Sequence, residues 1–191
     1  MSRLVAETFR EAGASVFLTT EPTKTWLGDA VRRAYDDDVG PIAESFLFLA
    51  DRAAHVVEIR AHLEKGELVL CDRYADSTYA YQGARLEGVV SDPVRFLQRA
   101  SEAWTVPPDL TLLLRVPAEL GLKRIQARPN LIRFEDLGFL KKVAANYDRL
   151  ARSRRFVVLD GAQDAKAVAA DAAAAIEKRV RRRQAVSGTS T

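Results

Sequence analysis

Short, mostly apolar runs recur along this chain, and they lack the regular polar alternation of a half-exposed strand. The runs lie at 16–18, 68–71, 110–116 and 156–159. Strands of this kind are buried on both faces, which is typical of a parallel sheet covered by helices. Helix-like segments separate them at about 3–12, 26–35, 43–65, 117–128, 136–152 and 164–183, with a further helix start near 93. This alternation predicts an α/β fold, a three-layer parallel sheet with helices on both faces.

The length and composition suit one domain. The chain has 191 residues, of which 48% are hydrophobic and 29% are charged, and these values exclude a disordered chain. No apolar run reaches the length of about 18 residues that a transmembrane helix needs. The single cysteine, Cys71, excludes an internal disulfide and suits a reducing compartment. We therefore predict a cytoplasmic protein with one domain at 1–183 and a disordered tail at 184–191.

Polar residues follow the predicted strands, at the edge of the sheet where ligands of such folds bind. Asp72 and Arg73 come directly after the second run. Arginine presents a planar, charged fork that matches phosphate oxygens, and an adjacent aspartate can hold that fork or face Mg²⁺. An isolated pair of this kind is more often a structural ion pair, but the next residues favour a binding site. They are hydroxyl and amide side chains suited to reading the edge of a base: Ser77, Thr78, Tyr81 and Gln82.

The segment 72–83 resembles the signature of the thymidylate kinase family, D-R-Y-x-x-S-x-x-A-Y-Q-G. Weaker resemblances run from about residue 4 to about 176, at 21–22, 47–56, 108–114, 116–119 and 128–135. The resemblance implies a P-loop nucleoside monophosphate kinase fold. It also implies the phosphorylation of dTMP to dTDP with ATP-Mg as donor, in dTTP synthesis. Within the single nucleotide kinase domain, a mobile lid is implied at about 128–138.

The family's roles, carried over to matching positions, imply how dTMP would bind. Phe48 would stack on the thymine ring, with ordinary core packing as the alternative for this residue. Arg52, one helical turn later, would face a thymine carbonyl oxygen. Arg73 would bind the phosphate, and Asp72 would lie near Mg²⁺, so that both would serve catalysis.

Other residues of the resemblance would surround the nucleotide. Thr78 and Gln82 would contact the base, with Ser77 beside them. Tyr81 would pack under the sugar, where it could exclude a ribose hydroxyl, and core packing is its alternative. Glu21 is assigned to the substrate site because Glu21 and the proline after it resemble the family's T-R-E-P segment.

The lid holds the arginines to which the resemblance gives a catalytic role. Arg128 and Arg133 frame a stretch with poor propensity for regular structure. A mobile loop could swing both side chains onto the phosphates, where negative charge develops during transfer. Arg124, Arg128 and Gln163 would contact ATP. The alternative for these basic residues is a solvated helix end.

The family's first strand and its P-loop, G-x-x-x-x-G-K-[ST], have no counterpart here, because no glycine in the sequence is followed by lysine. The chain begins in what resembles the helix after that loop. In this fold class the first strand lies between the strands that end at Cys71 and Val116, so we expect both to lack a neighbour. Our hypothesis is that Met1 is an internal methionine of a longer natural protein, and the printed chain could be inactive by itself.

Three smaller departures from the family pattern concern charge. Thr20 replaces the arginine before the Glu-Pro pair, and Lys24 stands where a glycine is usual. Lys24 could restore the charge lost at position 20, although an ammonium is a point charge and not a fork. Arg115 stands where the family often has aspartate, and the sequence offers no reason for it.

Two other functions stay open on the sequence. One is a related deoxynucleotide or nucleoside kinase, and the other is a non-catalytic nucleotide-binding protein without a P-loop. The predicted partners are dTMP and ATP, with no membrane, and the basic run at 178–183 suits the end of a helix better than nucleic acid. The resemblance also implies a homodimer formed through helix 43–65. The apolar face of that helix consists of Leu47, Ala50, Ala54, Val57 and Ala61.

Overall fold

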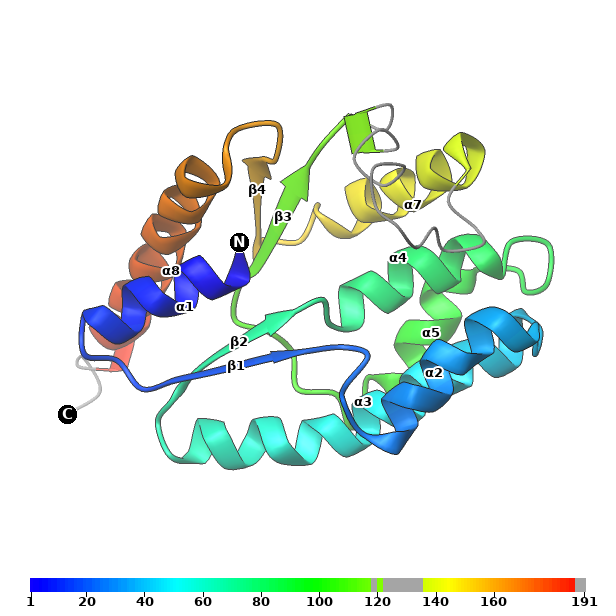
Figure 1. Ribbon diagram of the computed structural model, residues 1–191, viewed down its shortest axis with the longest axis horizontal. Coiled ribbons are helices and arrows are strands. Elements are labelled where there is room, and N and C mark those ends of the chain that lie inside the picture. The colour runs from blue at the N-terminus through cyan, green and yellow to red at the C-terminus, as the bar shows by residue number, and fades with distance from the viewer. Residues whose placement is uncertain (118–119, 122–135, 188–191) are drawn as a thin grey trace.

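Helices and short parallel strands alternate along the chain, as the sequence predicts (Figure 1). The computed structural model describes residues 1–117, 120–121 and 136–187. The first half contains α1 (Ser2–Glu11), β1 (Val16–Thr20), α2 (Trp26–Asp37), α3 (Pro41–Glu64), β2 (Leu68–Asp72) and α4 (Ala75–Arg85). The second half contains α5 (Pro93–Ser101), β3 (Thr111–Arg115), α7 (Leu137–Leu150), β4 (Phe156–Asp160) and α8 (Ala165–Ser187). The tail predicted at 184–191 therefore overlaps the end of α8.

The strands form two parallel pairs. β1 pairs with β2, with Val16 opposite Leu68, and β3 pairs with β4, with Thr111 opposite Phe156. Among the described residues no ladder joins β2 to β3, so each of these strands has one neighbour, as the sequence led us to expect. The α/β class and the parallel pairing are confirmed, whereas the structure shows two half-sheets and not one continuous three-layer sheet.

A large cavity lies between the two half-sheets. Its volume is about 1310 Å³, and residues of both β2 and β3 line it. The other lining side chains are largely apolar and include Val5 of α1, Ile59 of α3, Val143 of α7 and Ile176 of α8. The facing edges of β2 and β3 thus border an apolar space, a costly arrangement for backbone groups that have no ladder partner.

The sequence analysis missed helix α4. We predicted polar contacts over 75–85 but no helix, because the segment lacks an amphipathic stripe. The structure buries most of α4 between neighbouring helices, including the polar side chains of Asp76, Thr78 and Gln82. A helix that is buried on nearly all sides, with polar residues among the buried ones, has no apolar face for the sequence to reveal.

Two apolar clusters hold the elements together. In one, Tyr79 and Ala80 of α4 pack with Leu97 of α5 and Val143 of α7. In the other, Val5 of α1 packs with α8 and with the strands beside it. The first cluster fixes α4 and α7 against each other, and these helices carry much of the site described below.

A polar contact ties α4 to the second half-sheet. The guanidinium of Arg155, next to the start of β4, donates to both carboxylate oxygens of Asp76 at 2.6 and 2.5 Å. Thr111, the first residue of β3, donates to the same carboxylate at 3.1 Å. Asp76 is only 5% exposed, so this bidentate pair is largely shielded from water.

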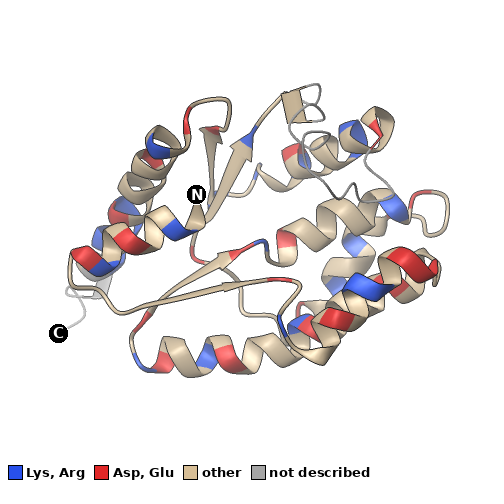
Figure 2. Cartoon of the chain, in the orientation of Figure 1, with Lys and Arg blue, Asp and Glu red and all other residues tan. Residues whose placement is uncertain are grey.

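Most of the other charged residues lie on the surface, and the buried exceptions, Glu21, Glu44, Asp51 and Arg52, are described below. Figure 2 shows acidic and basic residues interspersed along α1, α2 and α3, in keeping with a net charge of only +3. Within the described residues, no helix is both long enough and apolar enough to cross a membrane.

We expect Arg155→Ala to lower the free energy of unfolding by about 2–4 kcal/mol, because it leaves a buried carboxylate without its cation. Arg181→Ala is the matched control, since Arg181 pairs with Glu177 on the exposed surface of α8, and its cost should stay below about 0.5 kcal/mol. Urea unfolding of the parent protein and the two variants measures both changes in the free energy of unfolding. Equal losses for the two variants would show that the pair with Asp76 does not join the halves.

Candidate functional site

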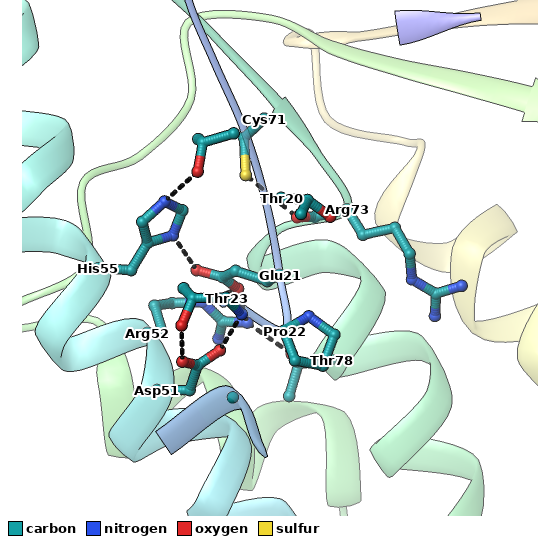
Figure 3. A network of polar contacts seen from close by, with 12 residues as sticks. Thr20, Glu21, Pro22, Thr23, Asp51, Arg52, His55, Cys71, Arg73 and Thr78 are labelled. Atoms are coloured by element: carbon teal, nitrogen blue, oxygen red, sulfur yellow. Dashed lines mark hydrogen bonds and ion pairs between the residues drawn. The ribbon is translucent and has the colours of Figure 1, made fainter. Parts of the chain in front are cut away.

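A buried carboxylate stands directly after β1. Glu21 is 4% exposed, and its Oε2 accepts hydrogen bonds from Nε and Nη2 of Arg52 on α3, at 3.0 and 2.7 Å (Figure 3). Arg52 is itself completely buried. Two charges removed from water are stable only when they are paired and hydrogen-bonded, and this geometry meets that condition.

His55 completes the surroundings of this carboxylate. Its Nδ1 lies 3.0 Å from Oε1 of Glu21, and its Nε2 lies 2.8 Å from the hydroxyl of Thr19 on β1. Because a carboxylate only accepts, Nδ1 must carry the proton of this contact. His55 therefore orients Glu21 and joins α3 to β1, which gives the histidine a structural role.

Asp51, the neighbour of Arg52, holds the loop that follows β1. Its carboxylate accepts from the backbone N–H of Thr23 at 2.8 Å and from the hydroxyl of Thr23 at 2.5 Å. The same hydroxyl lies 2.8 Å from that of Thr25, the N-cap of α2. The loop also packs closely on α2, because a Cβ on Gly28 would lie 2.0 Å from the carbonyl oxygen of Thr23.

The buried face of α3 is thus largely polar. His55 lies four residues after Asp51 and three after Arg52, so the three side chains share one side of the helix. The apolar face that the sequence analysis identified is the outer one. Val57 is 69% exposed, and Ala50, Ala54 and Ala61 are exposed as well.

A small cavity of about 240 Å³ lies beside this network, and most of the predicted substrate residues line it. Arg52 lies just behind the wall, where its Nη2 donates to the hydroxyl of Thr78 at 2.5 Å. The small cavity is lined by Glu21, Pro22, Arg32, Tyr35, Glu44, Phe48, Arg73, Tyr74, Ser77, Thr78, Tyr81, Gln82, Arg85 and Phe139. Helix α4 explains the convergence, because 77 and 81, like 78 and 82, are separated by one helical turn.

Arg73 points away from the buried network, toward the aromatic side of the small cavity (Figure 3). Its guanidinium carbon lies 4.5 Å from the centre of the Tyr81 ring, and the Tyr81 ring packs against Phe139 and Tyr147. The backbone of Arg73 has a φ of +65°, a left-handed conformation that is uncommon for a residue with a side chain. Such strain is often found where a side chain must face a ligand.

Several polar atoms at or beside the small cavity have no hydrogen-bond partner among the described residues. They include Nη1 of Arg52, the hydroxyl of Tyr74 and Oε1 of Gln82, all of which are shielded from solvent. Leaving a buried polar atom unpaired costs about 1–3 kcal/mol, so each such atom calls for an explanation. Among them, Nη1 of Arg52 is a donor and Oε1 of Gln82 is an acceptor, and such a pair matches a planar ring with one acceptor and one donor on its edge.

The sequence analysis missed several residues that line the small cavity. Arg32 and Tyr35 come from α2 and Glu44 from α3, and each looked like an ordinary surface residue. Burial raises the pKa of Tyr35 to about 12, so its phenol stays protonated and can donate a hydrogen bond. Spacing on α2 was the available signal, since Arg32 and Tyr35 are three residues apart and share a helix face.

Other predicted residues lie apart from the small cavity. Asp72 is exposed at the carboxyl end of β2, where Ser2 donates to its Oδ2 at 2.8 Å. Gln163 is exposed in the loop between β4 and α8, outside the lining of the small cavity. Arg124 and the lid arginines Arg128 and Arg133 lie outside the described residues, as does most of the predicted lid.

Two of the three departures from the family pattern, Arg115 and Thr20, have simple contacts. Arg115 donates to the carboxylate of Asp148 on α7, which gives this unexpected arginine an ion-pair partner. Thr20 donates to the backbone carbonyl of Asp72 at 2.8 Å and so joins the ends of β1 and β2. Cys71 donates to the backbone carbonyl of Arg73, and burial raises the pKa of its thiol, so it does not act as a nucleophile at neutral pH.

Within the described residues, no group of three or more His, Cys, Asp and Glu side chains could hold a metal ion. Mg²⁺ needs fewer protein ligands, because it is usually held by one or two carboxylates together with waters and substrate phosphates. The exposed carboxylate of Asp72 fits that mode of binding.

Comparisons with known proteins find one family model and several similar proteins. A family model described as thymidylate kinase matches residues 1–172. A "Probable thymidylate kinase" of Natronomonas pharaonis is 44% identical over 163 residues, covering 83% of this chain and 82% of the relative. Similar proteins of the same name occur in Methanococcoides burtonii, 40% identical over 86% of this chain and 84% of the relative, and in Halobacterium salinarum, 42% identical over 84% and 81%.

We expect Glu21→Gln to lower the free energy of unfolding by about 3 kcal/mol, because it leaves the buried guanidinium of Arg52 without an anion. Asp37→Asn is the matched control, since Asp37 pairs with Arg33 on the exposed side of α2, and its effect should be below about 0.5 kcal/mol. Urea unfolding at low and high salt measures both. A loss for Glu21→Gln that disappears in high salt would contradict a buried pair, which salt screens weakly.

Proposed function

This chain belongs to the thymidylate kinase family, and from that premise we propose how its residues hold dTMP during phosphoryl transfer. The protein is a dTMP kinase, an enzyme that converts dTMP to dTDP with ATP as the phosphoryl donor. The observation that carries our assignment of residues is the convergence of the signature segment, Phe48 and Glu21 on one small cavity.

The base is proposed to bind between Phe48 and the start of α4. Thymine carries an acceptor at O4 and a donor at N3, and the unpartnered atoms of the site include a donor, Nη1 of Arg52, and an acceptor, Oε1 of Gln82. Arg52 would donate to O4, and Gln82 would accept from N3–H. Phe48, half-buried in the wall, would stack on the ring, and Thr78 would support the guanidinium from behind.

The phosphate is proposed to meet Arg73. This guanidinium reaches the aromatic side of the small cavity, past the Tyr81 ring, so a nucleotide with its base near Arg52 would extend its phosphate toward it. The planar fork of arginine suits two phosphate oxygens. Tyr81 would lie under the sugar, and Ser77, which accepts from the hydroxyl of Tyr147 at 2.8 Å, would complete that wall.

The residues that we assign to ATP binding and to catalysis on the ATP side are proposed from the family resemblance. Arg128 and Arg133 are proposed to bring positive charge to the transferred group, where electrostatic stabilisation is the main contribution to catalysis. Arg124, Arg128 and Gln163 are proposed to contact ATP. Asp72 would hold Mg²⁺, which when bound neutralises the charge of the phosphates.

A homodimer through α3 is proposed as well. Four large apolar residues of this helix are exposed, Ile42 at 44%, Phe46 at 49%, Val57 at 69% and Leu63 at 41%. At 100° per residue the first three fall within about 60° of one another around the helix axis, so they form one stripe. An apolar stripe on a long, exposed helix is typical of a surface that packs against a second subunit. We propose a cytoplasmic location on the basis of the single cysteine and the nucleotide substrates.

The proposed phosphate contact is tested with Arg73→Ala, by calorimetric titration with dTMP and with thymidine. A charge-assisted contact to phosphate contributes about 1.5–3 kcal/mol, so affinity for dTMP should fall by about ten- to a hundredfold. Affinity for thymidine, which has no phosphate, should change by less than about threefold. Arg33→Ala on the exposed side of α2 is the control and should change neither. Equal losses of affinity for dTMP and thymidine would show that Arg73 does not bind the phosphate.

The proposed place of Tyr81 under the sugar is tested with Tyr81→Ala. We expect the preference for dTMP over ribothymidine 5′-monophosphate to fall by about tenfold, because the lost ring no longer excludes a 2′-hydroxyl by its volume. Tyr81→Phe keeps the ring and should keep the preference. Binding constants of both nucleotides give the ratio, and an unchanged ratio in Tyr81→Ala would assign Tyr81 to core packing alone.

A further inference from the structure

Glu44 is a buried carboxylate with no role in the assignments above. It lies in the first turn of α3, is 2% exposed, and lines the small cavity. Its Oε1 accepts from the amide nitrogen of Gln82 at 3.0 Å, and its Oε2 accepts from Nη2 of Arg85 at 3.1 Å. Arg85 thus balances the charge of Glu44, while the other oxygen is used to hold an uncharged side chain.

This contact fixes which way the amide of Gln82 faces. A glutamine amide has a donor end and an acceptor end of nearly the same shape, and it can turn over when its surroundings allow it. An ionised carboxylate only accepts, so the NH₂ group must face Glu44. The turned amide would place two oxygen atoms against each other inside the protein, where an unpaired charge is costly. The carbonyl oxygen of Gln82 is therefore the end left for a ligand.

We propose that Glu44 is a positioning residue that sets the preference for thymine over cytosine by holding the amide of Gln82 in one orientation. The proposal rests on the base contacts proposed above. It adds the group that determines whether Gln82 presents an acceptor or a donor to the base. Arg52 is held in a parallel way, because the buried carboxylate of Glu21 fixes its guanidinium. Each of the two base-reading side chains thus has a buried glutamate behind it.

Cytosine is mismatched at both positions. Its N3 is an acceptor and would face the carbonyl oxygen of Gln82, and its amino group at C4 is a donor and would face Nη1 of Arg52. Both protein atoms are shielded from solvent, so a base reaching them must shift the side chains that cover them. Water would then be poorly placed to relieve a mismatch, and the discrimination should be correspondingly large.

The test is Glu44→Gln, studied by calorimetric binding of dTMP, dCMP and N3-methyl-dTMP. A glutamine at this position can present a donor or an acceptor, so the amide of Gln82 becomes free to turn. We expect the dTMP to dCMP affinity ratio to fall by about tenfold or more, and the affinity lost on N3-methylation to shrink. Glu67→Gln is the matched control, because Glu67 pairs with His62 and does not line the small cavity. It should leave the ratio unchanged.

Three outcomes are distinguishable. A lowered ratio in Glu44→Gln supports the proposal. Equal losses for dTMP and dCMP, with the ratio preserved, would overturn it and make Glu44 a structural residue only. A parent protein that shows no preference for dTMP, and no loss on N3-methylation, would overturn the proposed base contacts and this inference with them. If Glu44→Gln does not fold, Glu44→Met, which removes the acceptor at similar volume, is measured for the same ratio.

Discussion

The buried ion pair between Glu21 and Arg52 is the interaction on which the site depends. Each charge loses several kcal/mol of hydration on burial, and only a full set of hydrogen bonds offsets that loss. Glu21 has those bonds from Arg52 and His55, and Arg52 in turn reaches Thr78. Because these groups come from the loop after β1, from α3 and from α4, the network holds three elements in one arrangement. A shift of any of them would leave a buried charge without its partner.

The same requirement explains the unusual character of α3. A helix of a globular protein normally turns its apolar side inward, but α3 buries Glu44, Asp51, Arg52 and His55 and leaves Phe46 and Val57 exposed. The inner face orients the side chains that we propose read the base, and the outer face is the surface that we propose joins two subunits. One helix thus serves both purposes, because polar side chains share its buried face with Leu49, Val56 and Ile59 and an apolar stripe lies on its exposed face.

The two half-sheets are held by side chains and helices, since no strand ladder joins them within the described residues. The packing of α4 on α7, the pair between Asp76 and Arg155, and the second apolar cluster, in which Val5 of α1 packs with α8, join the two halves. The small cavity lies at the same junction, because α2, α3 and α4 form most of its wall and Phe139 of α7 closes it. Its shape therefore depends on how the halves are placed relative to each other.

The sequence by itself determined the α/β class, the positions of the strands and the identity of half of the residues that line the small cavity. Apolar runs and the spacing of the polar residues within 72–83 are local features that can be read directly from the sequence. Only the tertiary structure decided that 75–85 forms a helix, that the polar face of α3 is the buried one, and that Glu44 and Tyr35 belong to the site. The reason is physical: a polar residue that is solvated and one that is buried beside a partner look the same in sequence. What separates them is a contact with residues about 30 or 40 positions away, such as that of Glu44 with Gln82, and no local pattern records it.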